Sequence, residues 1–211
     1  MKARKLILII VIAFVGMIFS FSAVQAYPVN VGDTIYLGNG PGNTNGGEFM
    51  VGKSTGEDLF RTFCMESDEF FSYNSAYIVG DISTEARDGG SGGPSPDPLD
   101  AKTAYLFYHF TIGDLSGYDY GAGRAGSADG LQRAIWFIEQ ENGGVYNSFV
   151  VLAESEINAG NWSGIGNVRV INLTDASGNL KQDQLILVPE PATMLLLGFG
   201  LLGLGLVRRT S

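Results

Sequence analysis

The sequence predicts an α+β fold in a single compact domain, flanked by two hydrophobic ends. Strand-like alternation comes first, helical periodicity follows, and two more strand-like segments close the block without an internal repeat. The 211 residues suffice for one domain or at most two small ones. Residues 6–26 and 191–207 contain no charged side chain, which sets them apart from an ordinary globular domain.

The N-terminal end has the three-part layout of a secretory signal peptide. Three basic residues lie within the first five positions, an apolar run covers 6–21, and small or polar residues lead up to Ala26. We expect cleavage after Ala26 and export of residues 27–188 as the folded domain. The alternative is an uncleaved membrane anchor, because the apolar run is nearly long enough to span a bilayer.

Six segments of the domain alternate between apolar and polar residues and are predicted strands. They cover residues 34–37, 48–51, 59–65, 76–79, 167–172 and 184–188. Stretches rich in glycine, with proline, asparagine or serine, are predicted loops at 38–47, 88–98 and 111–130. The last predicted strand runs directly into the C-terminal end of the chain.

Three helices are predicted between the fourth and fifth strands, at residues 99–110, 130–140 and 149–159. In the first helix Asp97 is the expected N-cap and Pro98 suits the first turn. The second has an apolar stripe with the helical period of 3.6 residues. The third starts after Ser148 and ends at Gly160.

The C-terminal end combines a proline-rich motif, a short apolar run and two arginines. The motif is Val188-Pro189-Glu190-Pro191, and Arg208-Arg209 follow the run. As a helix, residues 194–207 reach about 21 Å, which is shorter than a hydrocarbon core of about 30 Å. Arginines behind such a run stay on the cytoplasmic side. We therefore expect a transient membrane span, and the alternative is a proline-rich linker before a tail anchor.

These three parts, in this order, resemble the PEP-CTERM sorting signal of Gram-negative bacteria over residues 189–209. The resemblance implies recognition by an exosortase, a membrane cysteine protease-transpeptidase, with cleavage near the Pro-Glu-Pro motif. It also implies an inner-membrane intermediate and delivery to the cell surface or the extracellular matrix. Tails of this kind also carry an ice-binding label, for which the tail itself gives no physical reason.

The net charge of the chain is −9, and it becomes −13 for residues 27–188 because both ends are net positive. A field of this sign disfavours nucleic acid and anionic lipid as partners. Most acidic residues are interpreted as solvated surface. This includes Glu66, Asp68 and Glu69, although two of them could in principle form a glycosidase pair.

No metal or other cofactor is expected. Asp114, Asp119 and Asp129 lie in a glycine-rich segment, but their spacing does not match a calcium-binding loop. The chain has one cysteine and one histidine, so it lacks the Cys/His cluster of a zinc site.

Cys64 is the only cysteine, so an exported chain cannot use it for an internal disulfide. It is either a small buried hydrophobic residue, a partner in an intermolecular disulfide, or a nucleophile. A papain-type nucleophile needs a histidine base, and the only histidine is His109. His109 is interpreted as a packed helix residue.

Phe63-Cys64 and, 68 residues after the cysteine, Gln132-Arg133-Ala134-Ile135-Trp136 resemble the two motifs of the thioester domains of bacterial surface adhesins. The resemblance covers two short motifs within residues 58–188, and Leu131 replaces the threonine that commonly precedes the family's glutamine. It implies that the Cys64 sulfur and the Gln132 side-chain carbonyl join in an internal thioester with loss of ammonia. The expected walls of the thioester pocket are aromatic: Phe63, Tyr105, Tyr108 and Trp136.

Under this hypothesis the protein is not an enzyme but a single-turnover covalent binder. An amine or hydroxyl of a surface or matrix partner, with polysaccharide among the candidates, attacks Gln132 and releases Cys64 as a thiol. The alternative is a non-covalent structural or carbohydrate-binding matrix protein, in which Cys64 is merely buried and Gln132 closes a capping box begun at Asp129. A secreted hydrolase is the third candidate.

Overall fold

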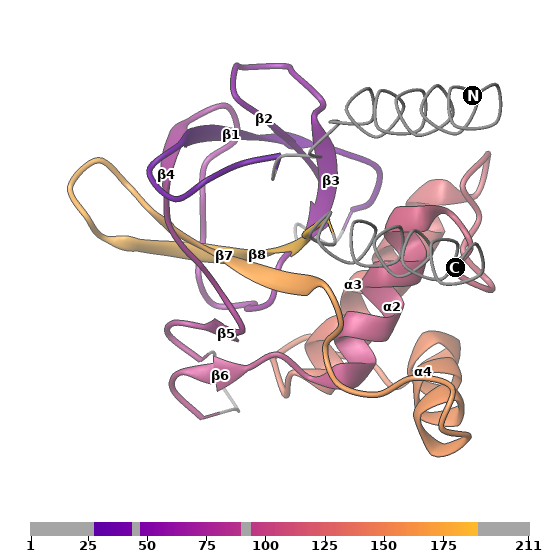
Figure 1. The fold of residues 1–211 in the computed structure, drawn as a ribbon. Coiled ribbons are helices and arrows are strands. Elements are labelled where there is room, and N and C mark those ends of the chain that lie inside the picture. The colour runs from indigo at the N-terminus through magenta and orange to yellow at the C-terminus, as the bar shows by residue number, and fades with distance from the viewer. Residues whose placement is uncertain (1–27, 44–46, 90–93, 190–211) are drawn as a thin grey trace, which may run out of the picture. The chain divides into compact units, whose positions relative to one another are not determined.

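The computed structural model describes residues 28–43, 47–89 and 94–189 (Figure 1). The predicted α+β class is confirmed in this part of the chain, which has three helices and eight strands and falls within one compact unit, residues 27–188. The predicted signal peptide with Ala26, and the tail residues Glu190, Pro191, Arg208 and Arg209, lie outside the described residues. None of the described helices is long and apolar enough to cross a membrane.

Six strands form an antiparallel sheet in the order β3-β2-β1-β4-β7-β8. Their bounds are Thr34–Asn39 for β1, Gly47–Gly52 for β2, Phe60–Phe63 for β3, Ala76–Ser83 for β4, Val168–Thr174 for β7 and Leu180–Leu187 for β8. Just beyond β3, Cys64 makes an antiparallel bridge to Gln184 of β8. The Met65 N–H donates to the Asp183 carbonyl over 3.1 Å. The two outer strands therefore meet, and the sheet curls round (Figure 1).

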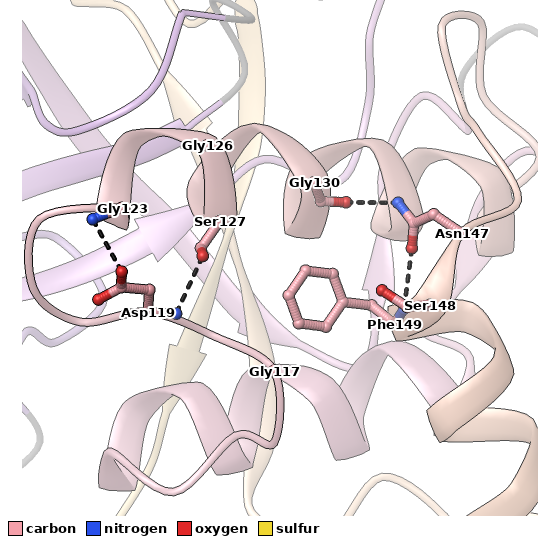
Figure 2. Close-up of a pocket in the computed structure, with 9 residues that line it drawn as sticks. All are labelled: Gly117, Asp119, Gly123, Gly126, Ser127, Gly130, Asn147, Ser148 and Phe149. Atoms are coloured by element: carbon pink, nitrogen blue, oxygen red, sulfur yellow. Dashed lines mark hydrogen bonds between the residues drawn. The ribbon is translucent and has the colours of Figure 1, made fainter.

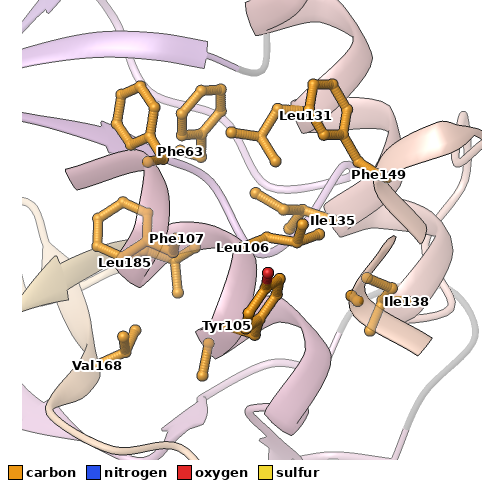
Figure 3. Packing of buried hydrophobic residues seen from close by; sticks show 14 of the residues in the cluster. Phe63, Tyr105, Leu106, Phe107, Leu131, Ile135, Ile138, Phe149, Val168 and Leu185 are labelled. Carbon is orange, nitrogen blue, oxygen red and sulfur yellow. The ribbon is translucent and has the colours of Figure 1, made fainter. Parts of the chain in front are cut away.

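Two hydrophobic clusters make up most of the core. One is formed by strand residues: Val29, Ile35, Leu37, Val51, Tyr77, Val79, Ile171, Leu173, Ile186 and Val188. The other joins the helices to one side of the sheet, where Phe63 of β3 and Leu185 of β8 meet helical residues such as Phe107, Leu131 and Ile135 (Figure 3). Burial of this apolar surface fixes the helices against the sheet.

The first helix, α2 (Ala101–Ile112), begins later than predicted. Asp97 does not cap it, because Asp97 lies in the two-residue strand β6 (Asp97–Pro98), paired with Ala86 of β5 (Glu85–Ala86). Asp100 is the N-cap, and its carboxylate accepts from the Lys102 N–H over 2.7 Å. The short strand pairing keeps the chain extended until that point.

The second helix, α3 (Arg124–Ile138), begins six residues before the predicted start. The Asp119 carboxylate accepts from the N–H groups of Gly121 and Gly123, at 2.7 and 2.8 Å, and so fixes the turn that precedes the helix. Gln132 consequently lies in the middle of α3, with Gly123 as N-cap, and the capping box begun at Asp129 is wrong. The third helix, α4, spans Ser148–Asn158 and is capped by Asn147.

Candidate functional site: the Cys64 and Gln132 neighbourhood

Cys64 and Gln132 are in direct contact in the core. The Cys64 backbone N–H donates to Gln132 Oε1 over 3.2 Å, and Gln132 Nε2 donates to the Cys64 carbonyl over 2.9 Å. Both residues are fully buried. The sheet brings Cys64 to its position just after β3, and the long α3 brings Gln132, 68 residues away in sequence, to the same place.

The two hydrogen bonds fix the Gln132 carboxamide in an orientation relevant to acyl chemistry. A backbone N–H that donates to a carbonyl oxygen polarises the carbonyl, and it stabilises negative charge that develops on that oxygen during nucleophilic attack. The bond from Nε2 to the Cys64 carbonyl holds the amide nitrogen against the backbone of the same residue. The carboxamide carbon of Gln132 therefore lies beside the residue that carries the thiol.

Aromatic side chains surround Cys64. Phe49 of β2 and Trp136 of α3 form a separate cluster with Cys64, and Phe71 packs against it, with its ring centroid 4.8 Å from that of Phe49. The Trp136 indole nitrogen is buried and has no oxygen or nitrogen acceptor among the described residues. This N–H lies by the sulfur and acts to lower the pKa of the Cys64 thiol.

Burial dominates the protonation of Cys64. It raises the pKa of the thiol well above its usual value, and the nearby charges of Glu66 and Glu141 raise it further, against the opposing effect of Trp136. Cys64 is therefore a neutral thiol at neutral pH. An incoming alkylating reagent must first reach a site with no solvent exposure.

Three of the four predicted wall residues lie in other surroundings. The Phe63 side chain belongs to the cluster between sheet and helices, 5.0 Å from the Phe110 ring. Tyr105 and Tyr108 pack against Trp162, at 5.8 and 5.2 Å between ring centroids. Of the predicted set, Trp136 is in the Cys64 cluster.

Sequence reasoning missed Phe49 and Phe71, which occupy the places expected for the tyrosines. Alternation in the predicted strand 48–51 indicates that one of its two faces is buried. This alternation was the sequence signal that could have identified Phe49 as a buried residue. The pairing of β2 with β3 then puts Phe49 opposite Thr62, two residues before the cysteine.

His109 lies in a different cluster from Cys64. Its Nδ1 is 2.7 Å from Asp114 Oδ1, and its ring is 4.5 Å from the Tyr105 ring and 6.0 Å from the Trp162 ring. A papain-type pair therefore lacks its base at this site. The surrounding rings instead make His109 part of a partly buried aromatic cluster at the edge of the core.

Glu66 is buried, so its interpretation as solvated surface is wrong. The chain continues from Cys64 alongside β8, where Glu66 Oε2 accepts from the Asp183 N–H over 2.8 Å. Burial, and then the charge of Asp183, raise the pKa of Glu66 to about 9. Within the described residues no three or more His, Cys, Asp or Glu side chains are arranged to hold a metal ion.

A second buried carboxamide lies near the thiol. Gln184 is the bridge partner of Cys64 across the sheet, so both side chains point to the same face. Gln184 Nε2 donates to the Gln182 carbonyl over 3.2 Å, whereas its buried Oε1 has no hydrogen-bond donor in the part of the chain that the structure describes. Any test of Gln132 must therefore also distinguish it from Gln184.

The hollow between the start of α3 and the start of α4 is a structural junction (Figure 2). Asn147 donates through Nδ2 to the Gly130 carbonyl over 2.8 Å, while its Oδ1 accepts from the Phe149 N–H over 2.9 Å. Asp119 is bound by the turn before α3. The polar groups of this hollow serve the two helix starts.

The C-terminal motif begins where the sheet ends. β8 stops at Leu187, and the buried Val188 still donates its N–H to the Asn167 carbonyl over 2.9 Å. Pro189 follows as the last described residue.

A family model described as the PEP-CTERM protein-sorting motif matches residues 187–209. The predicted sorting signal is therefore confirmed, and the chain is an exported protein that carries a signal for exosortase processing and for passage across the membrane towards the cell surface. Comparisons with curated proteins and with solved structures give no match.

Proposed function

We propose that the exported domain forms an internal thioester between Cys64 Sγ and Gln132 Cδ and uses it to attach covalently to a partner. The partner lies at the cell surface or in the extracellular matrix of a Gram-negative bacterium. The observation that supports this proposal is the pair of hydrogen bonds that holds the Gln132 carboxamide against Cys64 in a buried, aromatic-lined site.

Formation of the thioester requires no external reactant. The Cys64 sulfur attacks Gln132 Cδ, the C–N bond breaks, and the thiol proton leaves with the nitrogen as ammonia. The Cys64 N–H stabilises the oxygen of the tetrahedral intermediate. Exclusion of water by Phe49, Phe71 and Trp136 protects the product from hydrolysis.

Attachment then consumes the thioester. A partner's amine or hydroxyl attacks Gln132 Cδ, the C–S bond breaks, and Cys64 is released as a thiol while the partner stays bound through an amide or ester. The reaction runs once for each molecule, so the protein is a covalent binder rather than an enzyme.

A second candidate function is favoured by the same hydrogen bonds. If no thioester forms, the Gln132 side chain fastens α3 to the end of β3, with each bond stabilising the fold by about 1 kcal/mol. The domain would then be a non-covalent structural or carbohydrate-binding matrix protein, with Cys64 as part of its core.

Intact mass spectrometry distinguishes these two functions. Protein purified in amine-free buffer should weigh about 17 Da less than its sequence mass, because ammonia is lost when the thioester forms. Methylamine should then add at Gln132, and Cys64→Ala should abolish both the mass loss and the addition. A folded protein at full sequence mass would contradict the thioester and leave the structural function.

Two glutamine variants form a matched pair. Gln132→Ala and Gln184→Ala each remove one buried carboxamide near Cys64. We expect the mass loss to disappear in the first variant and to persist in the second. The reverse pattern would assign the acyl group to Gln184 and refute the Cys64–Gln132 linkage.

A further inference from the structure

The reactive pair of the proposed thioester is closed to solvent. Cys64 and Gln132 are both fully buried. A nucleophile must contact Gln132 Cδ in order to attack it, so part of the cover over the site has to move before a partner can be attached. Which part moves depends on how firmly each of the residues packed against Cys64 is held.

Two of the three aromatic covers belong to regular elements. Phe49 lies in β2, which pairs with β1 on one side and with β3 on the other. Trp136 lies within α3, and its carbonyl also accepts from the Glu141 N–H over 2.7 Å. A backbone movement that displaced either ring would break a strand ladder or a helical turn, so both rings stay in place when the domain opens only locally.

The third cover, Phe71, belongs to neither a strand nor a helix. It lies in residues 65–75, which connect Cys64 to β4. Its ring is half-buried and packs against the Cys64 cluster, with its centroid 4.8 Å from that of the Phe49 ring. The neighbouring Phe70 is 75% exposed. Phe71 is therefore the residue through which this connection closes the site.

Hydrogen bonds hold this connection at its two ends. Near its start, the Ser67 N–H donates to Glu141 Oε2 over 3.0 Å, and near its end the Ser72 N–H donates to the Tyr77 hydroxyl over 2.6 Å. Between them, the backbone of residues 68–71 forms no hydrogen bond within the described part of the chain. Segments with so few backbone hydrogen bonds and buried contacts are those that open at low cost.

We propose that residues 68–71, the Phe71 flap, are the gate of the Cys64–Gln132 site. Local opening of the flap withdraws the Phe71 ring and admits a nucleophile, while β2, β3 and α3 stay in place. This inference rests on the proposed thioester and specifies how its reaction is controlled. The closed flap shields the thioester from water, and the observed reactivity is the intrinsic reactivity multiplied by the fraction of molecules with an open flap.

The flap takes no part in making or breaking bonds. A partner's nucleophile still attacks Gln132 Cδ, and Cys64 still leaves as a thiol. Every nucleophile passes the same gate, so truncation of Phe71 should accelerate hydrolysis by water and aminolysis by methylamine by the same factor. A residue that contacted one nucleophile in particular would change the ratio of the two rates.

The test follows the modification of the purified full chain by small reagents. Protein that shows the mass loss of thioester formation is treated with methylamine. Protein at full sequence mass is treated with N-ethylmaleimide, which alkylates Cys64 as the only cysteine of the chain. We expect Phe71→Ala to react about 10- to 100-fold faster than the unaltered protein, because opening the flap no longer costs the packing of the ring.

Phe70→Ala is the matched control. It removes the same ring from the adjacent position, where the side chain is 75% exposed and lies outside the Cys64 cluster. This variant should react at the unaltered rate. Equal rates for Phe71→Ala and Phe70→Ala would overturn the gate.

Urea distinguishes opening of the flap from unfolding of the whole domain. Global unfolding exposes a large surface and responds steeply to urea, whereas the opening of four residues exposes little. We expect the modification rate to be nearly constant in urea well below the unfolding transition, in the unaltered protein and in Phe71→Ala. A rate that rises from zero urea with the full slope of global unfolding would overturn the flap, even if Phe71→Ala reacts faster.

Failure of this inference differs from failure of the proposed function. If the mass loss occurs but Phe71→Ala reacts at the unaltered rate, the flap is overturned and the thioester stands. If the unaltered protein has its full sequence mass, the thioester is refuted. The rates with N-ethylmaleimide then confirm or overturn the flap as the route to Cys64.

Discussion

In the proposed thioester, single residues around Cys64 would shield and activate the reactive bond. Phe49 and Phe71 contribute apolar surface, whereas the Trp136 side chain also acts to lower the pKa of the thiol. A buried N–H without an oxygen or nitrogen acceptor is costly, and such groups in native structures call for an explanation. Under the proposed thioester function, stabilisation of the departing thiolate supplies one for Trp136.

Replacement of Trp136 by phenylalanine tests that role. Trp136→Phe keeps an aromatic wall but removes the donor, so methylamine should open the proposed thioester about 10- to 100-fold more slowly, the equivalent of a lost hydrogen bond to a charged group. The rate is measured as the appearance of free thiol.

Trp162→Phe serves as its control. The Trp162 indole donates to the Gly164 carbonyl over 2.8 Å, and its ring lies in the His109 cluster. This variant should react at the unaltered rate. Equal rates for Trp136→Phe and the unaltered protein would exclude a role for the indole N–H.

Among the elements, α3 carries Gln132 and is itself held by β2. The buried Glu48 accepts from Arg124 Nε at 2.9 Å and Nη2 at 2.6 Å, and from the Tyr118 hydroxyl at 2.9 Å. A charge this deeply buried needs such partners. The contacts of Glu48 anchor Arg124, in the first turn of α3, to the strand residue that follows Gly47. Arg124 lies eight residues before Gln132.

Two glycines inside α3 give a matched stability test. A Cβ at Gly126 would meet nothing within 4 Å, so Gly126→Ala should raise the free energy of unfolding by about 0.4–1 kcal/mol. A Cβ at Gly130 would lie 3.2 Å from the Phe149 ring, so Gly130→Ala should gain less or destabilise the fold. Denaturant unfolding measures both.

An equal gain in the two variants would show that the Phe149 ring yields to the added methyl group. A loss in Gly126→Ala would show that this part of α3 is not a regular helix in solution.

The molecule as a whole buries several carboxyl groups. Burial raises the pKa of Glu66 to about 9 and that of Glu139 to about 8, from 4.5. The charge of Asp183 adds to the shift at Glu66, and that of Asp100 to the shift at Glu139. Between these values the folded state binds more protons than the unfolded state.

The unfolding free energy should therefore fall as the pH rises from about 5 to 8, by up to about 1.4 kcal/mol per pH unit for each such carboxyl. Urea unfolding across this range measures it. Glu66→Gln keeps an acceptor for the Asp183 N–H and should flatten the profile. Stability that rises with pH would contradict the burial of these groups in neutral form.

Local patterns accounted for the α+β class, the approximate strand positions and the sorting motif. Alternation, helical periodicity and a motif of contiguous residues are all properties of short segments, which is why the sequence revealed them. The start of α3 was missed because a residue distant in sequence stabilises it. The glycines in this part of α3 disfavour a helix, but Glu48 of β2 binds Arg124 in the first turn.

The sequence by itself determined the order of the six strands of the main sheet and of the three helices, and it determined the C-terminal sorting signal, because all of these are patterns of contiguous residues. It did not reveal the two-residue strands β5 and β6. Only the tertiary structure decided that the Gln132 carboxamide meets the Cys64 backbone, that Phe49 and Phe71 wall the thiol, and that Glu66 is buried. The physical reason is that these contacts depend on strand register and on the packing of α3 against β2 and β3.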